Sequence, residues 1–338
     1  MKPRLKAPDR AKAEKKAALK PLHYHIASDV EPLPVHWLWR PYIPRGVITT
    51  LEGQGGMGKS FISCAIAAAV SNGEPLPGQQ MYREPRRVLM LSAEDDMSRV
   101  IRPRLDALNA DTDNIALIPE AFTFDHDTIQ RLDLTVKGFA ATIVFIDPIL
   151  SYTGGKLDIN KGNDVRHGLM DPLKHIADKH NCAMIVVRHF GKSKKSAQNQ
   201  GLGSVDFTNA ARSQLQVRQW DDGSRTLMHT KTNYGEMGKM IEYTILPGEW
   251  DPIAEIEGPA TLVWGDIREE VEKPLVLSKR KQAENWLKDI LQSGPIPSSM
   301  LAERAKEDDI SMKTIKRAKR GLAESVKLKD GTWEWRLL

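Results

Sequence analysis

Residues 53–60 read GQGGMGKS, in which four glycines, a lysine and a serine have the spacing of a phosphate-binding loop. Glycine permits the backbone turns that aim successive N–H groups at one anion. Lys59 would reach the β- and γ-phosphates of a nucleotide, and the Ser60 hydroxyl would complete the coordination of Mg²⁺. The residues expected to hold the nucleotide are Gly53, Gln54, Gly55, Gly56, Met57, Gly58, Lys59, Ser60 and Phe61.

Three further polar residues each follow an apolar run, and a parallel sheet would bring them to the same edge as the glycine loop. Asp147 ends TIVFID and is expected to hold Mg²⁺ together with Ser60. Glu94 follows VLMLSA and is expected to be the general base that orients the attacking water. His189 follows AMIVVR and could sense the γ-phosphate, although a purely structural histidine would fit the same pattern. The ligands predicted by this set are ATP and Mg²⁺.

The flanking sequence contains the strand and the helix that such a loop requires. Residues 46–53 form a short β-branched apolar run typical of a buried strand, and residues 61–73 form an alanine-rich helical pattern that closes at Gly73. A strand, a glycine loop and a helix N-terminus together make an anion site. Further strands are expected at 86–94, 141–147 and 182–190, with helices at 97–108 and 165–180 between them.

The alternation of strands and helices predicts an α/β fold built on a parallel sheet. After Gly191 the pattern changes to strand-like pieces separated by turns, which predicts a β-rich extension of the same sheet. The aromatic segment HWLWRPYIPRG before the first core strand is expected to pack in the core and not to stack on adenine. The extension is expected to contain strands at 213–220, 224–232, 239–246 and 260–264.

The composition indicates a globular protein. The chain of 338 residues is 41% hydrophobic, which is enough for a sizeable core. No apolar run approaches the roughly 20 residues of a membrane span, and the lysine-rich start lacks the apolar centre of a signal peptide. We therefore expect a cytoplasmic protein without membrane partners. Cys64 and Cys182 are expected in the core, and no histidine and cysteine spacing indicates zinc.

Basic residues gather at the two ends of the sequence. Residues 1–20 carry eight Lys and Arg against two Asp and Glu, and residues 279–338 carry fourteen against nine, so the middle is acidic. This asymmetry favours contacts between the ends and a polyanion, although a basic tail can also serve only solubility. The expected organisation is a disordered segment at 1–34, an ATPase domain at 35–268, a linker at 269–279 and a small domain at 280–338.

The small domain is predicted to contain three short helices, at 281–297, 298–309 and 311–325, followed by a two-stranded ribbon at 326–338. This order resembles a winged helix, whose third helix would lie in the major groove of DNA, while a winged helix used for protein contacts is the alternative. Trp333 and Trp335 are two residues apart on a strand and are expected to face the small core. The cationic residues of the third helix expected to contact DNA are Lys313, Lys316, Arg317 and Arg320.

The order of the motifs GQGGMGKS, LSAEDD, IVFIDPI, IVVRHFGKS, GLGSVDFTNAARSQLQV and KTNYG resembles that of the RecA-like ATPases of the RepA-like hexameric helicase group, found on plasmids, phages and mobile elements. The resemblance covers roughly residues 35–265. It implies a RecA-like P-loop NTPase core with a twisted, mostly parallel sheet. It also implies a homo-oligomer, a hexameric ring that acts on DNA, with replication proteins as candidate partners.

The same resemblance assigns roles residue by residue. It implies that Lys59, Ser60, Glu94, Asp147 and His189 act as described above, and that Arg212 in AARSQ is an arginine finger inserted into the site of a neighbouring subunit. A surface arginine with a structural salt bridge is the alternative for Arg212. DnaB-like relatives carry a Lys-x-Arg pair at a comparable place, but this sequence has a lysine, Lys231, followed by threonine and asparagine. Lys231 is therefore expected to assist at the nucleotide, and the finger depends on Arg212 alone.

Two loops after strand ends, residues 151–164 and 191–204, are rich in glycine and lysine. In RecA-like rings the equivalent loops line the central channel and hold single-stranded DNA, so the resemblance implies sequence-independent, salt-sensitive DNA contacts here. Ordinary solvated loops would have much the same composition. The loop residues expected to contact DNA are Lys156, Lys161, Lys192, Lys194 and Lys195.

Taken together, these features predict an ATP-hydrolysing ring protein that unwinds or moves along DNA during replication of a plasmid, phage or mobile element. Two alternatives remain from the sequence. One is a RecA-like ATPase that coats or anneals single strands without unwinding duplexes. The other is a nucleotide-switched DNA-binding regulator in which turnover is incidental.

Overall fold

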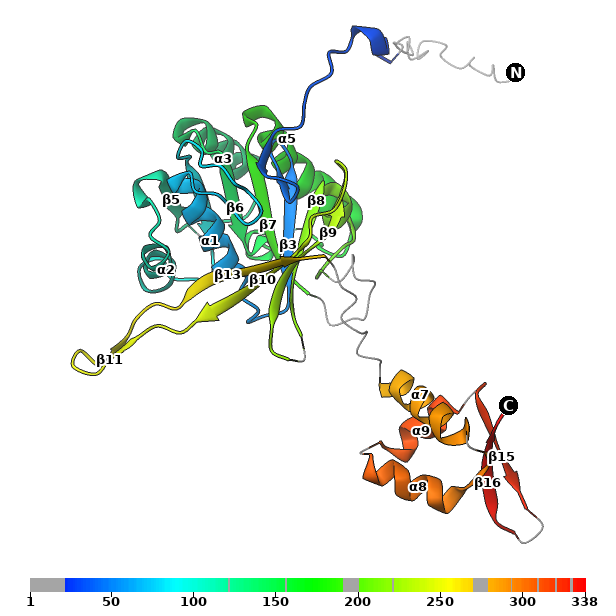
Figure 1. Cartoon of the computed structure of the whole chain (residues 1–338). Coiled ribbons are helices and arrows are strands. Elements are labelled where there is room, and N and C mark those ends of the chain that lie inside the picture. Colours follow the sequence, from blue (N-terminus) through cyan, green and yellow to red (C-terminus); the bar gives the residue numbers. More distant parts are fainter. Residues whose placement is uncertain are drawn as a thin grey trace, which may run out of the picture.

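The computed structural model describes residues 22–338 apart from 121, 156, 191–200, 221, 270–278, 293, 309, 320 and 329–330. Residues 37–268 are arranged around one large twisted sheet, and residues 279–338 form a smaller set of elements with a core of its own (Figure 1). No helix in the described part of the chain is long and apolar enough to cross a bilayer.

The large sheet joins a parallel half to an antiparallel half. In spatial order its strands are β13 (Thr261–Arg268), β10 (Met240–Leu246), β9 (Arg225–Thr232), β8 (Ser213–Gln219), β3 (Ile48–Gly53), β7 (Ala183–His189), β6 (Ile143–Asp147), β4 (Val88–Ser92) and β5 (Ile115–Ile118). Neighbours from β8 to β5 are parallel, and neighbours from β8 to β13 are antiparallel. The prediction of a mostly parallel α/β sheet is confirmed, and the strands after Gly191 extend it beyond β8.

Helices cover both faces of this sheet (Figure 1). Buried parallel strands are apolar on both sides because each face packs against helices. Along β6, Phe145 belongs to the core under one helical layer, whereas Val144 and Ile146 belong to the core under the other. The first layer contains α1 (Lys59–Asn72) and α2 (Arg102–Ala107), and the second contains α3 (His126–Phe139), α4 (Gly162–Val165), α5 (Asp171–His180) and α6 (Asp206–Ala210).

Strand β5 (Ile115–Ile118) and helix α3 (His126–Phe139), which lie between β4 and β6 in the chain, were not expected from the sequence. Strand β5 has only four residues and is half-buried at the sheet edge, so it lacks the apolar run that marks the inner strands. Helix α3 begins at a capping box, in which Asp125 accepts from the Thr128 N–H and the Thr128 hydroxyl accepts from the Asp125 N–H. The helix expected at 97–108 is confirmed, but its first turn, Met97–Ile101, is π-helical.

The hairpin of β10 and β13 extends beyond the sheet as an arm, residues 240–268 (Figure 1). Strand β9 pairs only with Ile241–Tyr243, whereas β13 pairs with β10 out to Leu246. Past that point the chain forms a second short hairpin, β11 (Trp250–Asp251) with β12 (Ile256–Glu257). We call residues 249–257 the tip of the arm.

The aromatic segment before β3 packs in the core, as predicted. Trp39 in β1 (Trp37–Trp39) and Ile43 in β2 (Ile43–Pro44) are fully buried. The indole N–H of Trp39 donates to the carbonyl of Pro77 at 2.9 Å, which satisfies its one polar group.

The smaller set contains three helices and a sheet of three strands within the described residues. The expected two-stranded ribbon is corrected, because Ile296 and Pro297 pair with the second strand of the ribbon. Trp335 lies at this pairing and is 5% exposed, whereas Trp333 lies nearer the hairpin turn and is 48% exposed, so only Trp335 faces the core. The elements are α7 (Lys279–Gln292), β14 (Ile296–Pro297), α8 (Ser298–Glu307), α9 (Met312–Ala318), β15 (Ala323–Lys327) and β16 (Trp333–Leu337).

Candidate active site

The glycine loop connects the end of β3 to the start of α1. Gly56 and Gly58 have φ of 74° and 93°, in the left-handed region that favours glycine. A Cβ on Gly58 would lie 2.6 Å from Ile245 Cδ1, whereas a Cβ on Gly55 or Gly56 would meet nothing within 4 Å. No side chain caps the first turn of α1, so its N–H groups are left for a ligand. The loop therefore fits an anion at the helix N-terminus.

Lys59 is buried, and its ammonium group is held by the loop itself. Nζ donates to the carbonyls of Gly53 and Gln54, at 3.0 and 2.8 Å, and lies 3.2 Å from Nδ1 of His189. Burial lowers the pKa of Lys59, while the nearby carboxylates of Asp147 and Glu94 act in the opposite direction. The ammonium group lies among acceptors where terminal phosphates would bind.

Ser60 and Asp147 form the part of the pocket that could hold a metal ion. The Ser60 hydroxyl donates to Asp147 Oδ2 at 3.0 Å, from the first turn of α1 to the end of β6. Burial raises the pKa of Asp147 to about 6, although the hydrogen bond from Ser60 acts to lower it. A hydroxyl and a carboxylate beside a phosphate loop are the oxygen ligands that Mg²⁺ takes with a nucleotide, so the residues fit the predicted ion.

Glu94 lies across the pocket, two residues beyond the end of β4. Its side chain is exposed, and Oε1 accepts from the Ser151 hydroxyl at 3.3 Å. The pocket has a volume of about 170 Å³. It is lined by Gly56, Gly58, Lys59, Ser60, Phe61, Ser92, Glu94, Asp95, Arg104, Asp147 and His189.

His189 closes the pocket at the end of β7. Burial, and then the neighbouring Lys59 ammonium, lower its pKa, so the ring is neutral near pH 7. Because Nδ1 accepts from Lys59, the neutral ring carries its proton on Nε2. The structure therefore brings Lys59, Ser60, Glu94, Asp147 and His189 to one pocket at the carboxyl edge of the sheet.

Two residues that support or line the pocket, Tyr243 and Arg104, were not predicted from the sequence. The Tyr243 hydroxyl, from β10, donates to the carbonyl of Met57 at 2.6 Å and ties the arm strand to the glycine loop. Arg104 lies 4.0 Å from the ring centroid of Phe61 and pairs with Asp95 at 3.2 Å. Neither has a sequence signal, because the contacts of Tyr243 with Met57 and of Arg104 with Phe61 join segments far apart in the chain.

The two acidic residues after Glu94 have different roles. Asp95 and Asp96 could both cap the helix that follows, because each precedes its first turn. Only Asp96 does so, and it accepts from the N–H groups of Ser98 and Arg99. Asp95 pairs with Arg104 instead, beside the pocket.

A buried ion pair lies directly behind the site. Glu52 and Arg188 precede Gly53 and His189, pair in register on adjacent strands and are fully buried, with Oε1 of Glu52 3.1 Å from Nη1 of Arg188. Arg188 also donates to the carbonyl of Leu202 at 2.9 Å. The pair joins the two strands that carry the glycine loop and the histidine.

Arg212 and Lys231 do not lie in this pocket. Arg212 precedes β8, and its N–H donates to the carbonyl of Ile48, so it is about five strand residues, or roughly 16 Å, from Gly53. Lys231 donates to the carbonyls of Thr208 and Ala211, at 2.5 and 2.7 Å. Both residues are therefore at the amino edge of the sheet, and neither can reach the nucleotide site of its own chain.

The predicted DNA-contacting residues have separate locations. Lys161 is exposed and lies 3.7 Å from Asp158. Lys313, Lys316 and Arg317 are exposed on α9, whose first turn is capped by Ser311 and whose Ile315 and Ala318 face the small core. The predictions that fall outside the described residues are Lys156, Lys192, Lys194, Lys195 and Arg320.

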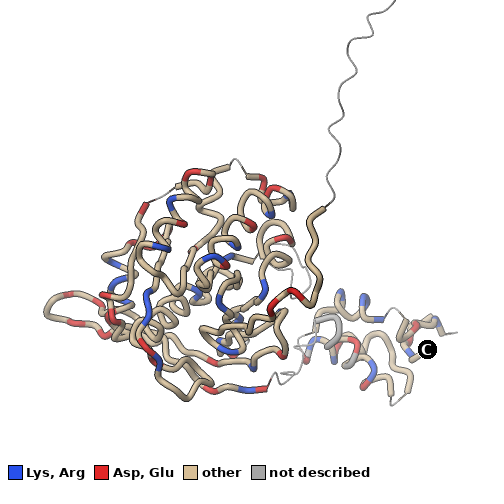
Figure 2. Tube along the Cα trace, turned by 90° about the horizontal axis from the view of Figure 1, so that it is seen from above, with Lys and Arg blue, Asp and Glu red and all other residues tan. Residues whose placement is uncertain are grey.

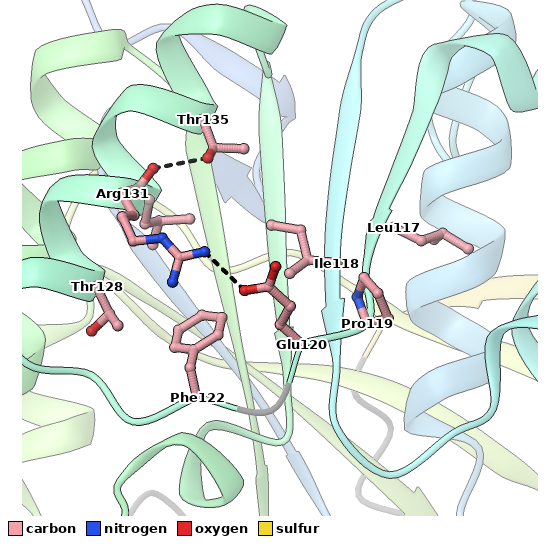
Figure 3. A pocket seen from close by; sticks show the side chains of 9 residues that line it. Leu117, Ile118, Pro119, Glu120, Phe122, Thr128, Arg131 and Thr135 are labelled. Carbon is pink, nitrogen blue, oxygen red and sulfur yellow. Dashed lines mark hydrogen bonds and ion pairs between the residues drawn. The ribbon is translucent and has the colours of Figure 1, made fainter.

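A second pocket of about 290 Å³ lies where β5 ends and α3 packs beside it (Figure 3). Leu117, Ile118 and Phe122 give it an apolar wall, and Arg131 pairs with Glu120 at 2.9 Å across its rim. No predicted site residue lines it.

Comparison with known families identifies the domain that contains the pocket. A family model described as an AAA domain matches residues 13–195. The matched range contains β3 to β7 and all five residues that converge on the pocket, but it ends before Arg212. A search of curated proteins finds no relative that matches the chain.

Proposed function

Because the chain belongs to the AAA-domain family and is thus a nucleotide-hydrolysing ATPase, we propose that it is an ATP-dependent DNA motor, a helicase that works as a ring of identical subunits. The observation that carries this proposal is the convergence of Lys59, Ser60, Glu94, Asp147 and His189 on one pocket. The finer assignment follows the resemblance to RepA-like hexameric helicases.

In the proposed mechanism the glycine loop binds the phosphates through its N–H groups and Lys59. Mg²⁺, held by Ser60 and Asp147, would supply positive charge to the phosphate oxygens. Glu94 is exposed at the pocket mouth and orients the attacking water, accepting its proton at a carboxylate oxygen. His189 donates from Nε2 to the γ-phosphate and loses this partner after hydrolysis.

The placement of Arg212 supports a shared site. An arginine at the amino edge cannot serve its own pocket, but it could serve the pocket of a neighbour in a head-to-tail ring. Such a finger contributes about 10³ to 10⁵ in turnover, so assembly would be a condition of activity. Lys231, whose pKa is lowered by burial and then by the charge of Arg212, lies near enough to assist it.

The smaller set of elements supports a DNA-binding role. The order α7, β14, α8, α9, β15 and β16, with the strands arranged β14-β16-β15, resembles a winged helix and supports the proposal that these elements form one. In that fold α9 is the helix that enters the major groove. Its exposed cations, with those expected in the loops at 151–164 and 191–204, would give salt-sensitive affinity.

The first test is the Lys59→Ala variant in a phosphate-release assay and in strand displacement on forked DNA. Both activities should fall at least 100-fold, because the variant has no ammonium group to meet the terminal phosphates. A variant with undiminished turnover would refute the phosphate assignment. In the unaltered protein, filament formation without unwinding would favour a RecA-like ATPase that coats or anneals single strands. Sequence-specific binding without unwinding would favour a nucleotide-switched DNA-binding regulator.

Mixing experiments test the shared site. Arg212→Ala should retain nucleotide binding and lose turnover, since its own pocket is intact. Mixed with Lys59→Ala subunits, which retain the arginine, it should recover part of the activity. A mixture that shows no recovery at any ratio argues against a finger supplied by a neighbour.

A further inference from the structure

The tip of the arm exposes large apolar side chains that pack against nothing in the described structure. Trp250, Ile253 and Ile256 are 60%, 94% and 60% exposed. Monomeric proteins rarely expose such a group together, and an aromatic residue beside aliphatic residues is typical of a contact with another protein. An isolated two-stranded hairpin is also marginally stable in water, so a partner would hold its shape.

The same tip is strongly acidic. It carries Glu249, Asp251, Glu255 and Glu257, with no Lys or Arg between residues 247 and 260. None of the four carboxylates forms an ion pair with any residue that the structure describes. The acidic side of the arm is visible as red segments along the loop that projects from the body in Figure 2. Its partner should therefore be both apolar and cationic.

A groove with this chemistry lies at the root of the same arm. It has a volume of about 710 Å³ and is walled by Trp37, Tyr42, Tyr234, Met237 and Ile267. Trp, Tyr and Met are the residue types enriched at protein interfaces. Tyr234 and Met237 are exposed and come from the loop between β9 and β10, while Ile267 comes from the end of β13.

The charges of the groove complement those of the tip. Arg40 and Lys239 line it with one carboxylate, Glu236. Lys239 is 2.7 Å from the exposed Glu269, and Arg40 has no ion pair with a described residue. Arg83 donates to the carbonyl of Trp37 at 3.1 Å, which places further positive charge beside the groove.

The geometry prevents one chain from filling its own groove. The root is where Met240 pairs with Arg268, and the tip begins past the pair Leu246 and Thr261. About ten strand residues, or roughly 30 Å, separate them. A tip and a groove on opposite ends of one hairpin are two different patches, and a contact between different patches of identical subunits is head-to-tail, the type that closes into rings.

We propose that the tip of the arm of one copy of this chain docks in the groove at the arm root of the next copy. Trp250, Ile253 and Ile256 enter the apolar groove, and the tip carboxylates face Arg40 and Lys239. This contact rests on the ring assembly proposed above, and adds to it the surface through which neighbouring subunits hold one another.

The first test measures oligomeric mass by analytical ultracentrifugation, with and without ATP and single-stranded DNA. The double variant Trp250→Ser with Ile253→Ser should need at least a tenfold higher protein concentration to assemble, because it removes two anchor side chains. The matched control is Leu134→Ala, which removes an exposed apolar side chain from α3 and should assemble like the unaltered protein. Unchanged assembly of the tip variant overturns the proposal.

A mixing test identifies the partner surface. A groove variant, Tyr234→Ala with Met237→Ala, should likewise need at least a tenfold higher protein concentration to assemble alone. Mixed with the tip variant, it should form pairs and no larger species, since such a mixture contains only one intact contact between two chains. Full rings from the mixture, or no pairs at all, would overturn a head-to-tail contact between these two patches.

These measurements separate this inference from the proposed function. If the unaltered protein stays a monomer under every condition, both the ring and the docking contact are wrong. If it forms rings and the tip and groove variants form them equally well, only the docking contact is wrong.

Discussion

At the scale of single residues, the role proposed for Asp147 and its buried surroundings favour opposite protonation states of its carboxyl group. It must be ionised to hold a metal ion, but burial raises its pKa to about 6. The nearby carboxylates of Asp95 and Glu94 also favour the protonated form, while the Ser60 hydrogen bond and the Lys59 ammonium favour the ionised form. Ionising the Asp147 carboxyl therefore costs free energy as long as no metal ion is bound beside it.

This conflict predicts a pH dependence for both activity and stability. As pH rises through about 6, Asp147 in the free protein loses its proton, so kcat/KM should rise over the same range. The free energy of unfolding, without nucleotide, should fall between about pH 4 and pH 6, because the folded state holds this proton more tightly than the unfolded chain. Steady-state kinetics and denaturant titrations across this range measure the two effects.

The Asp147→Asn variant is the control for that assignment. It should be more stable than the unaltered protein at pH 8 by about 2 kcal/mol, from roughly two pKa units less some solvent screening, and it should lose turnover. Equal stability of the two proteins at pH 8 would show that the charged Asp147 carboxylate does not destabilise the folded state.

At the scale of elements, the strands β3 and β7 act as a unit because Glu52 and Arg188 join them. Both side chains lie on the face opposite the pocket, since residues alternate along a strand and their neighbours Gly53 and His189 belong to the site. Phe207 lies over the Arg188 guanidinium at 4.3 Å and seals the pair from water. The spacing of the glycine loop and the histidine is therefore set by a contact outside the pocket.

Breaking this pair should destabilise the protein strongly. Arg188→Ala leaves Glu52 buried and unpaired, which should reduce the free energy of unfolding by about 3–5 kcal/mol. The matched control, Arg131→Ala, removes the exposed partner of Glu120 and should cost less than about 1 kcal/mol. Urea denaturation of both variants checks the difference, and a small effect at Arg188 would mean that water reaches Glu52.

At the scale of the whole molecule, the chain combines the large sheet, whose carboxyl edge carries the nucleotide pocket, with a smaller set of elements that presents cations on α9.

If α9 enters the major groove, Lys313→Glu with Lys316→Glu should weaken binding to duplex DNA at least tenfold. The slope of log affinity against log salt concentration should also fall by about one for each lysine that no longer neutralises a phosphate. Lys306→Glu, on α8, is the control with the same type of charge reversal. Fluorescence anisotropy at several salt concentrations measures both, and an unchanged slope would favour a protein-binding role.

The sequence predicts the pocket better than it predicts what supports the pocket. The glycine loop, Glu94, Asp147 and His189 each end a buried apolar run, and parallel strands bring such ends to one edge. Tyr243, Arg104 and the Glu52–Arg188 pair have no comparable pattern, because they depend on which strands become neighbours and on how side chains meet across the sheet. Strand β5 was missed for a related reason, since a short, half-buried edge strand has little periodicity.

The arm strand β10 has one further consequence. Tyr243 holds the carbonyl of Met57, Ile245 packs against Gly58, and the same strand runs on to the tip. Tension on the tip would therefore pass along a few residues of stiff β-ribbon into the loop that grips the phosphates. If neighbouring subunits dock as proposed, a pull on the tip of one subunit would reach the nucleotide bound by that same subunit, which would couple nucleotide turnover between neighbours.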